Sequence, residues 1–126
     1  MASDPAGGRK RAYGLAIQAL EAADAAGIES VKSKLFQLLG DIYFNANKLD
    51  IALKAYSDAV ASDGGLGDPE VHLRLGKAQF ELGDEGRAAD ELCRAYMGGG
   101  REIFSDQPQK YFEFLKTKIQ PGPDGW

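Results

Sequence analysis

Two side chains of this sequence have the chemistry of a nucleophile, a base or a metal ligand: His72 and Cys93. They are the only histidine and the only cysteine in the chain. Both fall within stretches of helical apolar spacing, and neither belongs to a recognisable motif with a second histidine, cysteine or serine. A zinc site needs three or four suitable ligands. We therefore interpret His72 as a packing residue and Cys93 as a small buried apolar side chain, and we expect no metal.

Glycines at 98–100 and a group of acidic residues could indicate phosphate binding or acid–base catalysis. The glycines, however, follow an expected helix, are not preceded by a strand and lack the Gly-Lys-Ser/Thr ending of a phosphate-binding loop. The acidic residues are Asp84, Glu85, Asp90 and Glu91. Capping and a solvated helical surface explain them without catalysis. The sequence thus predicts neither catalytic residues nor a cofactor, and the protein is expected not to be an enzyme.

Composition and charge also narrow the choice of partner. The chain has 126 residues, 44% of them hydrophobic and 27% charged, which suits one folded domain. A net charge of −4 disfavours binding to nucleic acid and to anionic membranes. The one basic run, Arg9–Arg11, is interpreted as solvated. Because the sequence has no apolar run of the ~20 residues that span a bilayer and no secretory signal pattern, a cytoplasmic location is expected.

Apolar residues recur at helical spacing along most of the chain, and the interruptions mark where helices begin and end. After a disordered lead of residues 1–8, the first helix is expected at 9–26, ended by Gly27. Ser30 or Ser33 can cap a second helix, which runs to the segment "NANK". A third helix follows directly and is closed by "SDGGLGD".

The fourth and fifth helices have clear start signals. Asp68 and Pro69 combine a cap with a proline at the first helical position, and the helix that follows runs to Gly83. Asp84 caps the next helix at once. That helix is expected to stop at the glycines of 98–100.

A last helix is predicted over 106–119, where Asp106 and Pro108 begin it. The flexible tail at 120–126 cannot continue it because it contains two prolines and two glycines. No stretch alternates as a half-buried strand should. We therefore predict an all-α domain over residues 9–119, built of about six helices.

The sequence contains an internal repeat at a spacing of 36 residues. The repeats span about 33–66 and 69–102, and each forms one helix pair that cannot bury its apolar stripe alone. Among the aligned pairs are Leu39 with Leu75, Gly40 with Gly76, Phe44 with Phe80, Asn47 with Gly83, Ala52 with Ala88, Tyr56 with Leu92, and Ala59 with Ala95. The small residues among them are expected where two helices approach closely.

The segments "LGDIYFNANK" and "LGKAQFELGD", with the spaced alanines that follow each, resemble the tetratricopeptide repeat, a helix-turn-helix unit of about 34 residues. The resemblance implies a short right-handed solenoid of antiparallel helix pairs, with capping helices at 9–26 and 106–119. Three residues depart from the family pattern. His72 stands for a large aromatic residue, Gln79 for a tyrosine and Asn47 for the turn glycine, although asparagine tolerates the left-handed turn.

The resemblance also implies that the first helix of each pair lines a concave groove that binds a peptide or helix of a partner protein. The expected groove residues are Lys34, Gln37, Asp41, Phe44 and Asn45 in the first repeat, and Glu70, Leu73, Lys77, Phe80 and Glu81 in the second. Phe44 and Phe80 are the expected apolar anchors. The alternative is that both rings pack against neighbouring helices.

The partner itself is not identified by these residues. Asp41 and Glu70 would repel the carboxylate end of a chaperone tail, so that use of the groove is not expected. The main alternative to a protein-binding adaptor is a self-assembling homo-oligomer joined through end helices around Tyr13 and Phe112. Trp126 is expected to pack on the last helix or lie in solvent, and docking into its own groove or a neighbour's is the other possibility.

Overall fold

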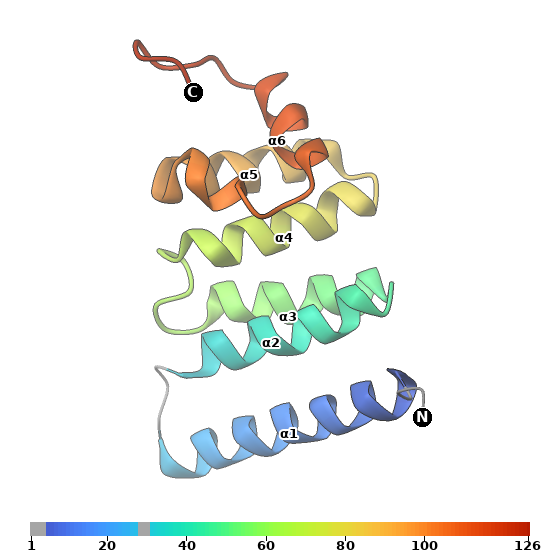
Figure 1. The fold of residues 1–126 in the computed structure, drawn as a ribbon. Coiled ribbons are helices and arrows are strands. Elements are labelled where there is room, and N and C mark those ends of the chain that lie inside the picture. Colours follow the sequence, from blue (N-terminus) through green and yellow to red (C-terminus); the bar gives the residue numbers. More distant parts are fainter. Residues whose placement is uncertain (1–4, 28–30) are drawn as a thin grey trace. The chain divides into compact units, whose positions relative to one another are not determined.

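The computed structural model describes residues 5–27 and 31–126. Across these residues the regular structure consists of α-helices and one 3-10 helix (Figure 1). The elements are α1 (Pro5–Ala26), α2 (Lys32–Asn45), α3 (Leu49–Ala61), α4 (Pro69–Glu81), α5 (Glu85–Gly99), η2 (Arg101–Phe104) and α6 (Gln109–Lys116). The predicted all-α class is therefore confirmed.

The chain divides into two compact units, Met1–Gly65 and Leu66–Trp126. The first contains α1 and the helix pair α2–α3, and the second contains the pair α4–α5 followed by η2 and α6. Each unit thus holds one of the two repeats found in the sequence. Within a pair the helices run antiparallel, because only a few residues connect them (Figure 1).

The turn inside each pair has the same backbone geometry in both units. Asn47 has a φ of 59° and its repeat counterpart Gly83 a φ of 86°, both in the left-handed region. The amide after each turn residue bonds back to the same point of the preceding helix: Lys48 N donates to Tyr43 O at 2.9 Å, and Asp84 N donates to Gln79 O at 2.9 Å. The expectation that Asn47 replaces a turn glycine is confirmed.

The glycine at the centre of each pair lies where the two helices approach closely. A Cβ at Gly40 would lie 2.4 Å from Tyr56 Cε1, and one at Gly76 would lie 2.9 Å from Leu92 Cγ. Tyr56 and Leu92 are themselves repeat counterparts, and both are almost fully buried. The close helix approach inferred from the repeat is therefore confirmed, because no larger side chain fits at either glycine.

The helix starts of the second unit are also as predicted, whereas the start of α2 is not. The Asp68 carboxylate accepts from Glu70 N at 3.0 Å, and that of Asp84 from Arg87 N at 3.3 Å. The prediction that Ser33 caps α2 was wrong: the helix begins at Lys32 without a side-chain cap. The buried Ser33 hydroxyl instead donates to Ala59 O on α3 at 2.9 Å. The other candidate cap, at residue 30, lies outside the described residues.

Several predicted boundaries shift. Helix α1 begins at Pro5, within the segment 1–8 that was expected to be disordered. Helix α5 continues through Gly98 and Gly99 and ends at Gly100, whose φ is 69°. A side chain at Gly99 would collide with Ile103, since a Cβ there would lie 2.9 Å from Ile103 Cδ1. The glycines therefore allow the chain to fold back tightly into η2, an element the sequence did not predict.

Helix α6 is shorter than the predicted 106–119 and covers Gln109–Lys116. Asp106 does not cap it, and its carboxylate instead accepts from the Gln107 side chain at 3.2 Å. At the other end Lys118 N bonds to Leu115 O at 2.8 Å, a tighter turn than an α-helix makes.

Both units have their own apolar core. In the first, Ala16 of α1 is buried with Leu39 and Ala55, so that α1 packs on the helix pair. Tyr13 and Tyr43 add an edge-to-face ring contact at 5.7 Å. In the second, the buried cluster joins α4, α5, η2 and α6: its members are Leu73, Leu92, Ala95, Phe104, Tyr111, Phe112 and Leu115.

Candidate functional site

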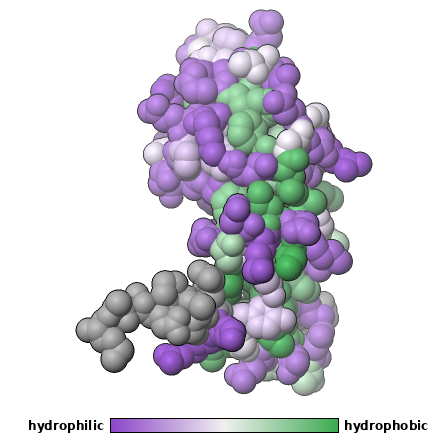
Figure 2. Space-filling model, turned by 90° about the vertical axis from the view of Figure 1, so that its right-hand side faces the viewer, coloured by the Kyte–Doolittle hydropathy of each residue, from purple (hydrophilic) through white to green (hydrophobic). Residues whose placement is uncertain are grey.

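Exposed apolar residues alone do not locate a site on this protein. Figure 2 shows a face on which hydrophilic residues cover most of the surface and apolar residues appear between them. Large apolar side chains such as Leu15, Leu38 and Met97 are exposed. Single exposed apolar residues are ordinary on soluble proteins. Exposed apolar residues therefore do not distinguish a binding site from the rest of this surface.

In the first unit, four of the five predicted groove residues of α2 reach the surface. Lys34 and Asn45 are exposed, whereas Phe44 and Asp41 are half-buried. The Asp41 carboxylate accepts a 2.6 Å hydrogen bond from the hydroxyl of Tyr56 on α3, which fixes its position. The turn of α2 nearest its carboxyl end thus presents an aromatic ring among polar side chains.

Gln37, the fifth residue, is an interior side chain with 3% exposure. Its amide nitrogen lies 3.4 Å from the Ser33 hydroxyl, which in turn bonds to Ala59 O. The second of these bonds joins α2 to α3, and the first ties Gln37 to it. Gln37 therefore belongs to the packing of the unit and is not presented on its surface.

In the second unit, Leu73 is also an interior residue. It is 2% exposed and belongs to the apolar cluster with Leu92 and Leu115. Its position in the repeat predicts that Leu73 faces a groove, whereas the structure buries it. Packing against α5 and α6 accounts for its burial, because α6 supplies Leu115 to the same cluster.

Helix α6 also packs on the aromatic anchor predicted for α4. The Phe80 ring makes edge-to-face contacts with Tyr111 at 5.5 Å and with Phe114 at 5.0 Å. The alternative weighed from the sequence, that Phe80 packs against a neighbouring helix, is what the structure contains. Aromatic residues of α6 thus cover part of the second helix pair.

The charged residues beside Phe80 are held by the same helix. Glu81 forms an ion pair with Lys110, and the Tyr111 hydroxyl lies 3.4 Å from its carboxylate. Burial, and then the charge of Glu81, raise the pKa of Tyr111 from its ordinary 10.0 to about 12. Lys77 donates to Gln107 Oε1 at 2.6 Å, just before α6 begins.

Glu70 is the predicted residue of α4 that remains well exposed. It lies in the first turn of the helix, and its carboxylate is 3.6 Å from the Arg74 guanidinium. An exposed ion pair of this kind contributes little to stability. The predicted groove positions of the second unit therefore fall into three kinds. Leu73 is buried, and Glu70 is exposed to solvent. The other three contact α6 or the turn before it: Lys77, Phe80 and Glu81.

His72 is a packing residue, as predicted. It is 5% exposed, and both ring nitrogens are engaged: Nδ1 lies 2.5 Å from Glu91 Oε2 and Nε2 lies 2.6 Å from Leu66 O. A carbonyl oxygen only accepts, so Nε2 carries a hydrogen and donates a hydrogen bond to Leu66 O. The ring thus ties α4 to α5 and to the loop before α4, and neither nitrogen is open to a substrate.

Cys93 is half-buried against the apolar cluster of the second unit. Within the described residues no three or more His, Cys, Asp or Glu side chains are grouped as a metal site would require.

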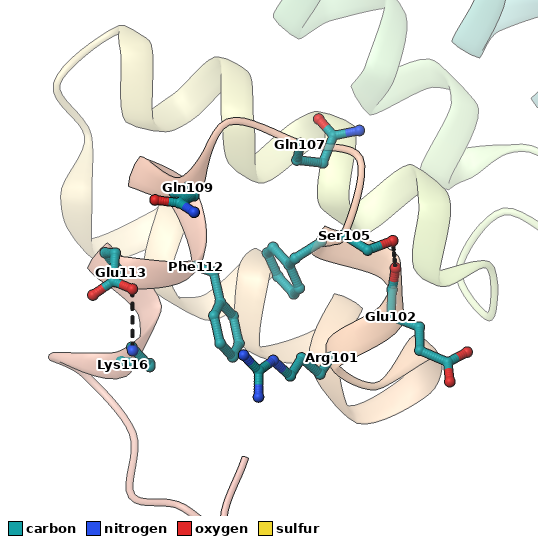
Figure 3. Close-up of a pocket in the computed structure, with 9 residues that line it drawn as sticks. Arg101, Glu102, Ser105, Gln107, Gln109, Phe112, Glu113 and Lys116 are labelled. Atoms are coloured by element: carbon teal, nitrogen blue, oxygen red, sulfur yellow. Dashed lines mark hydrogen bonds and ion pairs between the residues drawn. The ribbon is translucent and has the colours of Figure 1, made fainter.

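A pocket that the sequence did not predict lies at the carboxyl end of the second unit, and we call it the end pocket. Its volume is about 580 Å³, and it is formed by η2, α6 and the turn between them (Figure 3). Arg101, Phe104, Gln109, Phe112 and Lys116 line it, with others. Sequence reasoning treated residues 101–105 as a break between helices, so the 3-10 turn that brings Arg101 and Phe104 beside α6 was missed.

No helix in the described part of the chain has the length and apolar character needed to cross a membrane. No protein-family model matches the sequence, and neither does any curated protein.

A structural match gives independent support for the fold. A crystal structure of the Yersinia enterocolitica type III secretion chaperone SycD, in complex with a peptide of the translocator YopD, superimposes with a TM-score of 0.52 at 17% sequence identity. The match covers 86% of this chain and 89% of SycD. At this identity the likeness concerns the fold alone. The protein therefore has an all-α, tetratricopeptide-like helical-repeat fold.

Proposed function

We propose that this protein is a non-catalytic adaptor of the tetratricopeptide-repeat type, which binds a peptide or helix of a partner protein. The observation that carries the proposal is the helix-pair fold shared with SycD, which was crystallised with a peptide bound. A common fold does not by itself define a function. The surface residues of the two units are therefore the second support for the proposal.

The surface that best suits this role lies on α2, and we call it the α2 surface. It consists of Asp41, Phe44 and Asn45 in the carboxyl-terminal half of the helix, with Lys34 in its first turn. A half-buried aromatic ring surrounded by polar residues is the usual make-up of a binding hot spot. Asp41 is already fixed by Tyr56, so little side-chain entropy is lost when a partner contacts it.

The equivalent residues of α4 are proposed to have a lesser part. Lys77, Phe80 and Glu81 already contact α6 or the turn before it, so a partner would compete with those contacts. Glu70 is exposed and can contact a partner without such competition.

The test is selection of peptides against the whole protein from a displayed library, followed by measurement of the dissociation constant of the best peptide. Phe44→Ala is expected to raise that constant by about tenfold or more, because loss of a hot-spot aromatic costs about 2 kcal/mol. Leu38→Ala is the matched control, since Leu38 is an exposed apolar residue on another side of the same helix. Circular dichroism establishes that both variants are folded.

The outcomes decide the proposal. If Phe44→Ala binds the peptide as the wild type does, the α2 surface is not the site. If the library yields no peptide that binds, the adaptor function itself is refuted. Phe80→Ala is expected to lower stability as well as binding, since its ring packs on Tyr111 and Phe114.

A further inference from the structure

The end pocket has the size and make-up of a ligand site. Its volume of about 580 Å³ falls within the range of about 300–1,000 Å³ typical of small-ligand pockets. Two aromatic rings belong to its lining: Phe104 and Phe112, with centroids 5.2 Å apart. Both residues are largely buried and belong to the core of the second unit, so this part of the lining is rigid.

Two cationic side chains line the end pocket, and only one of them forms an ion pair among the described residues. Lys116 lies 5.6 Å from the centroid of the Phe112 ring, and its ammonium forms a 3.1 Å ion pair with Glu113. Arg101 lies 5.8 Å from the same centroid and forms no ion pair within the described part of the chain. Figure 3 shows the Arg101 guanidinium beside Phe112, with the Glu102 carboxylate directed away from it.

Arg101 therefore offers its hydrogen-bond donors to a ligand. A guanidinium presents a planar fork that binds a carboxylate in two parallel hydrogen bonds. The Gln109 side-chain amide, also in the lining, can pair with a peptide group.

The chain itself displays one kind of segment that fits beside these rings. Trp126 makes an edge-to-face contact with Phe112 at 5.8 Å and another with Tyr96 at 6.1 Å. The Tyr96 hydroxyl donates to Trp126 O at 2.8 Å, and Gly125 N bonds to Gly122 O at 3.0 Å in the turn before it. An aromatic residue carried on a short turn thus packs against Phe112.

We propose that the end pocket binds a short segment of a partner protein in which a carboxylate side chain lies close to an aromatic one. The carboxylate pairs with Arg101, and the aromatic ring packs against Phe104 and Phe112. The partner is another protein and not a second copy of this chain, because Trp126 of this chain is already seated on Phe112 and Tyr96 within its own unit. The end pocket shares no residue with the α2 surface, so the two proposals stand or fall separately.

The probes are two peptides, each acetylated at its amino end and amidated at its carboxyl end. One is Gly-Pro-Asp-Gly-Phe, and the other has Asn in place of Asp. Neither peptide contains tryptophan. Trp126, the only tryptophan of the chain, therefore reports binding through its fluorescence, because its ring packs against Phe112, which lines the pocket. The proteins are the full chain, its Arg101→Gln variant and an Arg87→Gln control. Arg87 is an exposed arginine of α5 that does not line the pocket.

The wild type is expected to bind the Asp peptide about tenfold more tightly than the Asn peptide. A hydrogen bond to a charged group contributes enough free energy to change a dissociation constant by about tenfold. Arg101→Gln is expected to remove that difference, and Arg87→Gln to keep it. Amide resonances in two-dimensional NMR should shift at Gln109 and Phe104 on binding. Because Arg101 is exposed, the variant is expected to fold, and circular dichroism checks this.

Four results would overturn the proposal. They are the absence of binding, equal affinity for the two peptides, an equal loss in Arg87→Gln, and NMR shifts confined to α2 or α4. A fifth result would overturn the choice of another protein as the partner. If light scattering shows a dimer, and the Asp peptide dissociates that dimer, a second copy of the chain supplies the segment.

Discussion

Replacement of Gly76 by alanine tests whether the close approach of α4 and α5 is essential to the helix pair. A Cβ there would lie 2.9 Å from both Leu92 Cγ and Leu92 Cδ2, and 3.2 Å from Leu92 N. Unstrained carbon–carbon contacts are about 3.5–4.0 Å. Leu92 has no exposed surface, so its side chain has no open space to move into.

The expected free-energy change combines two opposing terms. Forcing an extra methyl group into a packed interior costs about 1–3 kcal/mol. Alanine is better than glycine within a helix by about 1 kcal/mol. With a mid-range cost of about 2 kcal/mol, Gly76→Ala should lower the free energy of unfolding by about 1 kcal/mol.

Gly86→Ala is the matched control, because Gly86 lies in α5 and a Cβ there would have nothing within 4 Å. It should raise the free energy of unfolding by about 0.5–1 kcal/mol. Urea unfolding followed by far-ultraviolet circular dichroism measures both variants against the wild type. If Gly76→Ala is as stable as Gly86→Ala, the steric reasoning is refuted. Gly40→Ala, whose Cβ would lie 2.4 Å from Tyr56 Cε1, should be the more destabilising counterpart in the first unit.

Two further predictions concern buried polar groups of the second unit. Gln79 is 8% exposed, and its Oε1 has no hydrogen-bond partner among the described residues, so Gln79→Met should raise the free energy of unfolding by about 1 kcal/mol in the same urea assay; a decrease would mean that the amide has a stabilising partner. The raised pKa of Tyr111, about 12, means that between about pH 10 and 12 the unfolded chain loses this proton before the folded one, so stability falls as the pH rises through that window. Tyr111→Phe should lose less stability than the wild type between about pH 9 and pH 11 in urea titrations, and equal losses would contradict the assignment.

Helix α6 changes which residues of the second unit reach the surface. Its residues Tyr111 and Phe114 pack on Phe80, and Lys110 pairs with Glu81. The same helix lines the end pocket on another of its sides, through Phe112 and Lys116. In the second unit, α6 therefore covers much of the predicted α4 surface and, together with η2, forms a pocket.

The sequence alone determined the all-α class, the two helix pairs and most helix positions. These features follow from local signals: apolar spacing, the Asp68 and Asp84 caps, and the Asn47 and Gly83 turns, each of which depends on residues near one another in the chain. The repeat at 36 residues added the non-local contacts of Gly40 and Gly76, because equivalent residues occupy equivalent places in a repeated unit.

Tertiary structure decided which of the predicted groove residues reach the surface. The side chains of Gln37 and Leu73 face the interior, although their repeat positions suggested otherwise. The contacts of Phe80 and the existence of the end pocket depend on where α6 lies. That position results from the burial of Leu115 and Tyr111 in a core shared with α4 and α5. No local pattern encodes such packing, because it is selected by the combined apolar surface of segments far apart in the chain.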